Sequence, residues 1–153
     1  MIDYKLEHIL SFVGRGGMAP EAIGPMPEGL RVNFYNTGGE VSGPRIQGKL
    51  RSVGGDWVTV RKDGVAILDA RVTFETDDDA LILVTYPGII DFGEDGYDRF
   101  QRGDLPPAAQ IRTSPRFFAS HPKYMWLNRL HCLGIGEYSP TNRTASYDVY
   151  AVR

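Results

Sequence analysis

The sequence holds few features that assign a function on their own. Only one of its 153 residues is cysteine, so no disulfide can form within the chain, and Cys132, in an apolar stretch, is expected to be a buried, unreactive thiol. No apolar run approaches the roughly 18–20 residues of a membrane-spanning helix. The net charge of −2 and the lack of a basic run argue against nucleic-acid binding. We therefore expect neither a membrane nor a nucleic-acid partner.

The start of the chain also lacks the pattern of a secretory signal. Its first residues, MIDYKLE, carry charges where such a signal has an apolar core, so a cytoplasmic location is expected. The hydrophobic fraction (42%) and the charged fraction (24%) are ordinary for a soluble globular protein. At this length we expect one domain over residues 1–153, large enough to bury a substantial core.

Signatures of metal, cofactor and covalent catalysis are missing as well. His8, His121 and His131 are far apart, and no Cys/His/Asp cluster has metal-ligand spacing, so no metal site is predicted. Gly14–Gly17 is glycine-rich but no amphipathic helix follows it, which argues against a phosphate-binding loop or a dinucleotide site. No Gly-x-Ser-x-Gly elbow is present. What is left is acid–base chemistry without a cofactor, or simple ligand binding.

Strand patterns are abundant, and convincing amphipathic helices are not. Residues 14–29 and 91–108 are rich in glycine and proline and are expected to be loops, the second one a lid over a site. Closing the sheet removes exposed edges, so the sequence favours a single antiparallel β-barrel of about eight to ten strands, which can hold one small ligand. Outside the centre of the chain, alternation of apolar and polar residues predicts strands over these segments: 2–13, 30–35, 44–52, 109–114, 124–135 and 144–152.

Residues 54–88 are expected to form three consecutive strands joined by two tight turns. Asp63-Gly64 favours a two-residue type I′ turn, because both residue types tolerate positive φ. The second turn is expected to have Asp78-Asp79 as its central pair. Together the two turns decide which residues of the three strands lie opposite one another.

In that register Asp56, Arg71 and Tyr86 form one row across the three strands, with Asp69 diagonally adjacent. A carboxylate, a guanidinium and a phenol aligned this way could orient a polar small molecule. The alternative is a solvated Asp–Arg surface pair, which contributes about 0–1 kcal/mol, since the opposite face carries apolar residues from Trp57 to Phe74 and looks like the better core face. Periodicity alone leaves both interpretations open.

A chemical role can be assigned to each member of this row. Asp69 or Asp56 could act as a general base if burial raised the pKa of its carboxyl. Arg71, Tyr86 and Asn128 could stabilise negative charge that develops on an enolate or phenolate oxygen. We therefore treat Asp69, Arg71, Asp56 and Tyr86 as candidate catalytic residues.

A second group of residues could contact the substrate. Tyr124 and Trp126 would supply apolar walls with a polar tip on each ring, although ordinary core packing is the more common role of buried aromatic residues. Asn128 lies among apolar neighbours, so it needs a hydrogen-bonding partner, which is either a core group or a ligand. Asn33, in the expected strand 30–35, and Arg116 are further candidate contacts.

Several short stretches, spread over most of the chain, form a recognisable combination. They are Ile23-Gly24-Pro25, Glu28-Gly29-Leu30-Arg31, Gly54-Gly55-Asp56-Trp57, Leu68-Asp69-Ala70-Arg71, Pro115-Arg116-Phe117, Tyr124-Met125-Trp126-Leu127-Asn128-Arg129 and Tyr147-Asp148-Val149-Tyr150. Together they resemble a bacterial and fungal family called domain of unknown function 3237, also known as uncharacterised protein family 0311. The likeness runs nearly end to end, with one departure at Asp79, where the family usually has glycine. It implies a closed antiparallel β-barrel and no established activity.

The resemblance also favours the site interpretation of Asp56, Asp69, Arg71, Trp126 and Asn128, because polar residues within a family signature are more often functional than random surface pairs. Two functions of different classes follow. One is a cofactor-independent isomerase, lyase or cyclase acting on a small, partly aromatic or carbonyl-bearing metabolite. The other is a small-molecule-binding barrel without catalysis.

Three structural outcomes separate these functions. A carboxyl with a strongly raised pKa inside a pocket would favour the enzyme. An apolar pocket without a titratable group would favour the binding protein. A scaffold that only assembles into homo-oligomers, a state that the sequence leaves open, would have no cavity of ligand size.

Overall fold

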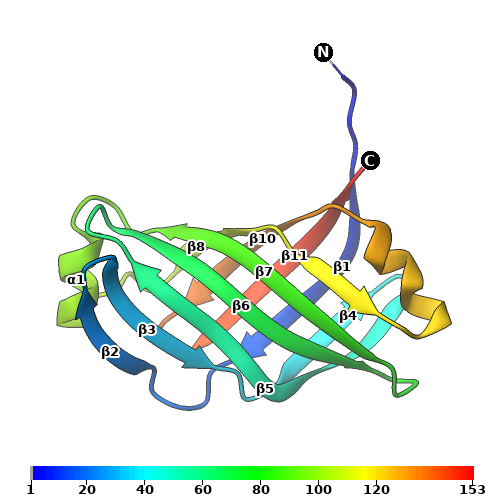
Figure 1. The fold of residues 1–153 in the computed structure, drawn as a ribbon, viewed down its shortest axis with the longest axis horizontal. Coiled ribbons are helices and arrows are strands. Elements are labelled where there is room, and N and C mark those ends of the chain that lie inside the picture. The colour runs from blue at the N-terminus through cyan, green and yellow to red at the C-terminus, as the bar shows by residue number, and fades with distance from the viewer. Residues whose placement is uncertain (1) are drawn as a thin grey trace.

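The structure, a computed structural model, describes residues 2–153 (Figure 1). Within them the chain forms eleven strands and two short helices, α1 and the 3-10 helix η1. The prominence of strands confirms the all-β prediction. In chain order the elements are β1 (Leu6–Arg15), β2 (Glu21–Met26), β3 (Gly29–Tyr35), β4 (Gly39–Gly43), β5 (Ile46–Val60), β6 (Val65–Thr76), β7 (Leu81–Asp91), α1 (Gly96–Arg102), β8 (Ala109–Thr113), β9 (Arg116–Ala119), η1 (Pro122–Arg129), β10 (Cys132–Ser139) and β11 (Thr144–Val152).

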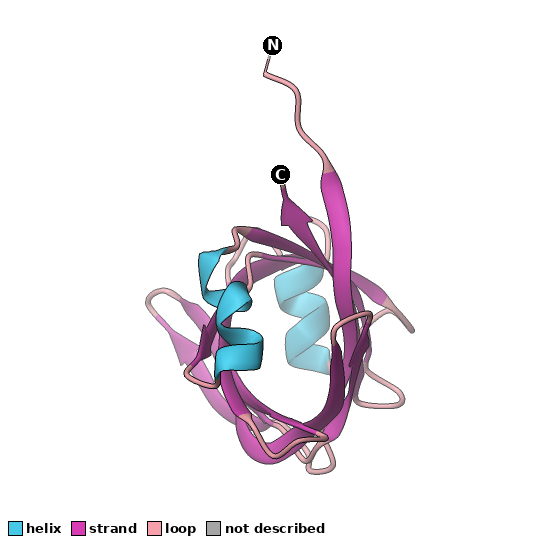
Figure 2. Cartoon of the chain, turned by 90° about the vertical axis from the view of Figure 1, so that its right-hand side faces the viewer, coloured by secondary structure: helices cyan, strands magenta, loops and turns pink. Residues whose placement is uncertain are grey.

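Eight of the strands close into an antiparallel barrel. Their order around the ring is β5-β4-β1-β11-β10-β8-β7-β6, and pairing of β6 with β5 closes it. The remaining strands extend the ring: β3 pairs with the second half of β5 and carries β2, while β9 pairs with β7. Figure 2, which looks along the barrel from the η1 end, shows the strands as a ring with one helix at either end. The prediction of a closed barrel is confirmed.

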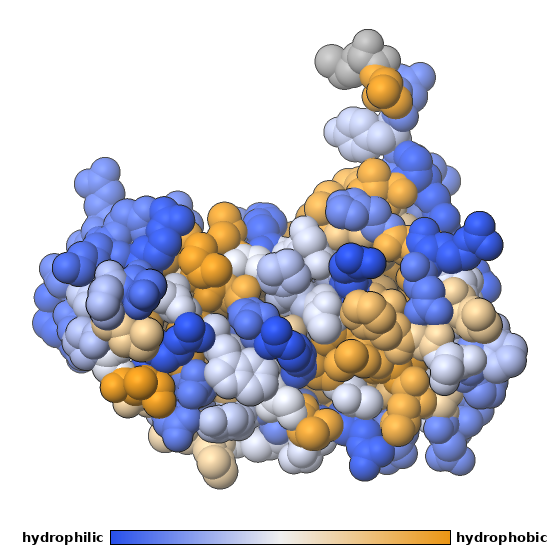
Figure 3. All heavy atoms as spheres, viewed as in Figure 1, coloured by the Kyte–Doolittle hydropathy of each residue, from blue (hydrophilic) through white to orange (hydrophobic). Residues whose placement is uncertain are grey.

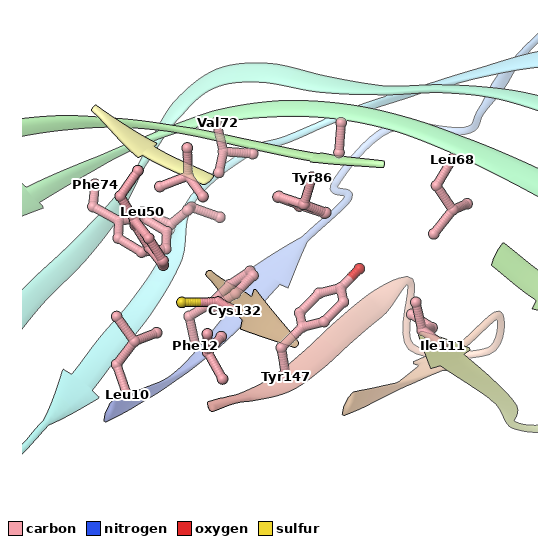
Figure 4. Close-up of a cluster of buried hydrophobic side chains, with 14 of the residues drawn as sticks. Leu10, Phe12, Leu50, Leu68, Val72, Phe74, Tyr86, Ile111, Cys132 and Tyr147 are labelled. Atoms are coloured by element: carbon pink, nitrogen blue, oxygen red, sulfur yellow. The ribbon is translucent and has the colours of Figure 1, made fainter. Parts of the chain in front are cut away.

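Inward-pointing side chains fill the middle of the barrel (Figure 4). Phe12 of β1 packs against Phe74 of β6, with ring centroids 5.2 Å apart, and stacks on Tyr147 of β11 at 4.5 Å. Phe74 is fully buried and also lies beside Phe117, at 6.4 Å. Cys132 is buried in the same interior, and burial raises the pKa of its thiol to about 11. This aromatic layer divides the interior of the barrel into two ends.

The outside of the barrel is not uniformly polar. On β7 the outward-facing Leu81, Leu83 and Ile89 are 50%, 43% and 45% exposed, and Phe118 of β9 lies opposite Leu83. Figure 3 shows the apolar surface on this side of the molecule. Both faces of β7 are therefore apolar, so its sequence pattern alone does not show which face forms the core.

The prediction of a single strand over 124–135 is wrong, because this segment divides into η1 and β10. Pro122 begins the helix, where its fixed φ is already helical, and the ring of His121 accepts a hydrogen bond from the backbone two residues on. Tyr124 and Leu127, three residues apart, are buried, as the threefold repeat of a 3-10 helix predicts for one face. No helix within residues 2–153 has the length and apolar character to cross a membrane.

Other boundaries differ less. The loop predicted over 14–29 contains the end of β1 and all of β2, where Gly24, at φ +112°, accompanies an irregularity in the pairing with β3. The strand expected over 44–52 begins two residues later, because Pro44 and the residue after it form the turn between β4 and β5. The long 91–108 connection between β7 and β8 is present and carries α1.

The two central turns each contain one residue more than predicted. The first loop is three residues long and ends in Gly64 at φ +83°, because the N–H of Arg61 donates to the carbonyl of Val65 at 2.9 Å. The second is also three residues long and ends in Asp79 at φ +63°. Three-residue loops ending in a left-handed residue are a common solution for antiparallel hairpins. The two-residue prediction is therefore wrong at both turns.

Each additional loop residue shifts β6 by one position against its neighbour, and such a shift moves a side chain to the other face of the sheet. Asp56 of β5 pairs with Ala70 of β6, and Ala70 pairs with Tyr86 of β7. The predicted row of Asp56, Arg71 and Tyr86 is therefore wrong. Asp56 and Tyr86 share the inner face, whereas Arg71 lies on the outer face.

Candidate functional site

The barrel contains a cavity at the end that α1 covers. Its volume is about 110 Å³, measured as space open to the centre of a water molecule, which is room for several waters or one small organic molecule. Phe92 and Phe100, from the connection that carries α1, line it, and their rings lie 5.9 Å apart. Much of the remaining wall is apolar, including Val58, Leu68 and Ile111. The predicted lid segment thus contributes to the wall of this cavity.

Asp56 supplies the only carboxyl among the residues that line the cavity. The β5–β6 ladder is interrupted beside it: Asp56 pairs with Ala70, Thr59 pairs with Ile67, and the two positions between them are unpaired. The N–H of Asp69 donates instead to Oδ1 of Asp56, at 2.8 Å. Among residues 2–153 no hydrogen bond is made to Oδ2 of Asp56, so this oxygen is available to a molecule in the cavity.

Burial sets the protonation of this carboxyl. The pKa of Asp56 is raised to about 7, mainly because the carboxyl is removed from water; the hydrogen bond from the backbone of Asp69 lowers the pKa, and the charge of Asp69 raises it. Near neutral pH the group is therefore divided between its acid and its carboxylate. A group in that state can both accept and donate a proton.

Two tyrosines share the cavity wall with Asp56. Tyr86 and Tyr147 are buried, with ring centroids 5.5 Å apart. Burial raises the pKa of both phenols, and the charge of Asp56 raises it further. Both hydroxyls therefore stay protonated at neutral pH and can serve as hydrogen-bond donors to an oxygen that gains negative charge.

Tyr147 is the member of this group that the sequence-based reasoning did not select. It lies in the Tyr147–Tyr150 stretch and shares one face of β11 with the buried Val149 and Ala151, which follow it at every second position. That alternation predicts an inward-facing phenol in a barrel strand. The signal was therefore present in the sequence, although it does not by itself separate a site residue from a core residue.

Other candidates lie on the outer face of the same wall. Asp69 and Arg71 form an ion pair at 3.1 Å, and their side chains are 58% and 53% exposed. The guanidinium of Arg71 also lies over the ring of Trp57, 5.8 Å from its centroid. Asn33 faces the same side, where its amide donates to Glu21 at 2.9 Å. None of these side chains lines the cavity.

The remaining candidates lie at the opposite end of the barrel. The hydroxyl of Tyr124 donates to Asp78 at 2.6 Å, and the ring of Trp126 lies beneath Arg45, 4.1 Å from the guanidinium carbon. Arg116 is exposed on β9. The aromatic layer around Phe74 lies between this end and the cavity, so the structure does not bring these residues together with Asp56.

Asn128 takes the structural alternative that the sequence left open. Its amide nitrogen donates to the carbonyl of Ala119 at 2.7 Å, and its oxygen accepts from the N–H of the same residue at 2.8 Å. The side chain therefore fastens η1 to β9. Within residues 2–153, no group of three or more histidine, cysteine or carboxylate side chains is placed to hold a metal ion.

Asn128→Ala should lower the free energy of unfolding by about 1–2 kcal/mol, because it leaves two backbone groups of Ala119 without their partner. Chemical denaturation followed by tryptophan fluorescence measures this loss. Arg129→Ala, an exposed neighbour at the end of the same helix, is the matched control and should cost less than about 0.5 kcal/mol. Equal losses in the two variants would contradict the fastening role.

The family resemblance is supported by comparison with known proteins. The chain matches the family model described as "Protein of unknown function (DUF3237)" over residues 4–152. The UPF0311 protein RPA1785 of Rhodopseudomonas palustris is 32% identical over 125 residues, which cover 80% of this chain and 81% of that protein. The predicted family is therefore confirmed.

Solved structures share the whole fold. The crystal structure of RPA1785, described as a conserved protein of unknown function, covers 100% of both chains with a TM-score of 0.88 and 28% identity. A β-barrel-like protein from Acinetobacter baumannii covers 100% of this chain and 98% of its own, with a TM-score of 0.83 and 26% identity. An enzyme from Penicillium herquei has a TM-score of 0.68 at 21% identity and covers 100% and 97%, a likeness that shows the fold alone.

Proposed function

The chain belongs to the DUF3237 family, and from the geometry of its cavity we propose that it is a cofactor-independent enzyme in which Asp56 transfers a proton to or from a small, partly aromatic or carbonyl-bearing molecule. The observation that carries this proposal is the carboxyl of Asp56, which lies in the cavity wall with a pKa raised to about 7. A strongly perturbed carboxyl in a cavity is typical of catalytic sites. The proposed reaction class is isomerisation, elimination or cyclisation.

In the first step the Asp56 carboxylate removes a proton from a carbon next to a carbonyl, or from a phenol. The electron pair of the broken bond moves onto the substrate oxygen, which becomes an enolate or a phenolate. Tyr86 and Tyr147 donate hydrogen bonds to that oxygen, and the apolar surroundings strengthen these bonds. The protonated Asp56 then returns its proton to another atom of the substrate, so the enzyme is restored without an oxidant or a reductant.

The alternative is a barrel that binds the same molecule without changing it. The apolar wall around Leu68 and Ile111 favours binding in either case. A purely binding site, however, gains nothing from a buried carboxyl with a raised pKa, because raising the pKa by one unit destabilises the charged form by about 1.4 kcal/mol. The carboxyl therefore favours catalysis over binding alone.

Proton abstraction can be tested before the natural substrate is known. The wild-type protein in D₂O at neutral pD is expected to accelerate exchange of the methylene protons of 4-hydroxyphenylacetone, followed by proton NMR. Asp56→Asn should lower the enzyme-dependent rate by about 10²–10⁴-fold, the usual contribution of a general base, while ligand binding is retained because asparagine has nearly the same shape.

Asp69→Asn is the matched control, since it makes the same chemical change on the outer face of the wall, and it should leave the exchange rate within about twofold. Binding of the ketone with no exchange above buffer would identify a binding protein. Equal loss of exchange in the Asp56 and Asp69 variants would refute the assignment of the base.

A further inference from the structure

The exposed residues that line the cavity mark its mouth. They are Arg15, Met18, Pro20, Tyr35 and Arg143. Most come from the loop between β1 and β2 or from the loop between β10 and β11. The two loops are fastened together, because the N–H at position 16 donates to the carbonyl of Arg143 at 2.8 Å. The mouth is thus a defined rim.

The two cations of this rim differ in their surroundings. Arg15 is neutralised, since its Nη2 lies 2.6 Å and 2.7 Å from the two carboxylate oxygens of Glu40. Among residues 2–153 no carboxylate lies within ion-pair distance of Arg143. The charge of Arg143 acts on the Tyr138 hydroxyl, where it opposes the rise that burial causes in the pKa of that phenol. Arg143 is therefore a free positive charge at the cavity mouth.

The interior offers no comparable partner for an anion. Asp56 lines the cavity and is partly ionised at neutral pH, and the wall around it is mostly apolar. An anionic group placed beside Asp56 would therefore be repelled by its carboxylate and poorly solvated. Aromatic side chains lie between the two regions, with Phe34 edge-on to Tyr138 at 5.9 Å. The cavity thus has a positive rim, an aromatic passage and a reactive carboxyl.

We propose that the molecule bound here is an organic acid, whose carboxylate pairs with Arg143 at the rim while its aromatic or carbonyl-bearing body enters the barrel toward Asp56. This assignment names the substrate class and the specificity-determining residue of the site, and it rests on the proposed function. Arg143 fixes the orientation of the molecule, because only one end of it carries the charge. A neutral analogue of the same shape loses that contact.

The test compares 4-hydroxycinnamate with 4-hydroxycinnamamide, two molecules of one shape that differ in the charged group. Dissociation constants are measured at pH 7 and low salt by NMR titration of the full chain. Wild-type protein is expected to bind the acid about 5–10 times more tightly than the amide, as one charge-assisted contact at a partly exposed site allows. The preference should shrink as salt is added.

Arg143→Gln should bring the ratio of the two dissociation constants to about 1. Arg15→Gln is the matched control and should leave the wild-type ratio within about twofold, because Arg15 is already paired with Glu40. Equal binding of acid and amide to wild type, an unchanged ratio in Arg143→Gln, or no binding of the acid at millimolar concentration would each overturn this inference.

The outcome is separable from that of the proposed function. An acid preference that depends on Arg143, together with unchanged proton exchange in Asp56→Asn, would leave the carboxylate site standing and remove the catalytic role. Loss of exchange in Asp56→Asn with no acid preference would do the reverse.

Discussion

Asp56→Asn should make the folded protein more stable than wild type above pH 7. The pKa of Asp56 rises from 3.8 to about 7 on folding, so between about pH 4 and pH 7 the folded state holds a proton that the unfolded state has released. Wild-type stability therefore falls as pH rises through this window, and the loss is complete above the folded-state pKa. At about 1.4 kcal/mol per pH unit between 3.8 and about 7, the difference at pH 8 is about 4 kcal/mol.

The measurement is urea unfolding of both proteins from pH 4 to pH 8. The difference should be smallest at pH 4, close to the ordinary aspartate pKa of 3.8, where little of the loss has accumulated and asparagine also offers an acceptor to the N–H of Asp69. Stabilities that differ by the same amount at all pH values would show that the carboxyl titrates normally, and the pKa argument for catalysis would be lost.

Asp78 provides a control with the opposite sign. Hydrogen bonds from Lys123, Thr76 and Tyr124 lower the pKa of its carboxyl. A lowered pKa contributes stability that is present at neutral pH and is lost as pH falls below the ordinary range of an aspartate. Asp78→Asn should therefore destabilise the protein at pH 8, where Asp56→Asn stabilises it, so a general effect of removing negative charge would be recognised at once.

Phe74→Ala should destabilise the protein by about 3–5 kcal/mol. The side chain is fully buried and packs between Phe12 and Phe117, so its removal leaves a cavity in the aromatic layer that the closed sheet cannot collapse to fill. Urea unfolding at pH 7 gives the free-energy difference. The layer is also the floor of the candidate site, and we expect a larger hollow connected to it.

Phe118→Ala is the matched control for this substitution. Phe118 lies on the outer face of β9 and is 48% exposed, so the same change of residue should cost less than about 1 kcal/mol. Comparable costs at the two positions would mean that the layer around Phe74 is not a close-packed core.

The fold was predictable because its determinants are local. Alternation over 30–35, 109–114 and 144–152 gave strands close to β3, β8 and β11, and the abundance of short strands without amphipathic helices favoured closure. η1 was missed because its apolar residues were interpreted with period two. Tyr124, Leu127 and Leu130 are spaced by three, which matches a 3-10 turn, and Pro122 marks its start.

The site was only partly predictable, because it depends on register. An Asp-Gly pair suits a two-residue loop, but it also suits a three-residue loop that ends in a left-handed glycine, which Gly64 forms. Both turns gained one residue, so β6 moved by one against each neighbour while β5 and β7 kept their relation to each other. For this reason Asp56 and Tyr86 stayed on one face and Ala70 replaced Arg71 between them.

The alternation of apolar and polar residues along β6 indicates the correct register. Leu68, Ala70, Val72 and Phe74 form a continuous apolar face, and giving that face priority over the turn type places Arg71 outside. The pattern of β7 does not distinguish the two registers, because its outward-facing residues are also apolar. Where a hairpin has one clearly amphipathic strand, that strand is the better guide to register than the loop.

The interruption of the ladder beside Asp56 has a practical consequence for mutagenesis. Oδ1 of Asp56 accepts the N–H of Asp69 where a backbone hydrogen bond between β5 and β6 is missing, so the carboxyl proposed to transfer the proton also holds the two strands together. Asp56→Ala would remove this hydrogen bond between β5 and β6 as well as the acid. A loss of activity in that variant would then not distinguish a disrupted barrel wall from a lost proton transfer. Asp56→Asn retains an oxygen that accepts the N–H of Asp69, which makes it the informative substitution at this position.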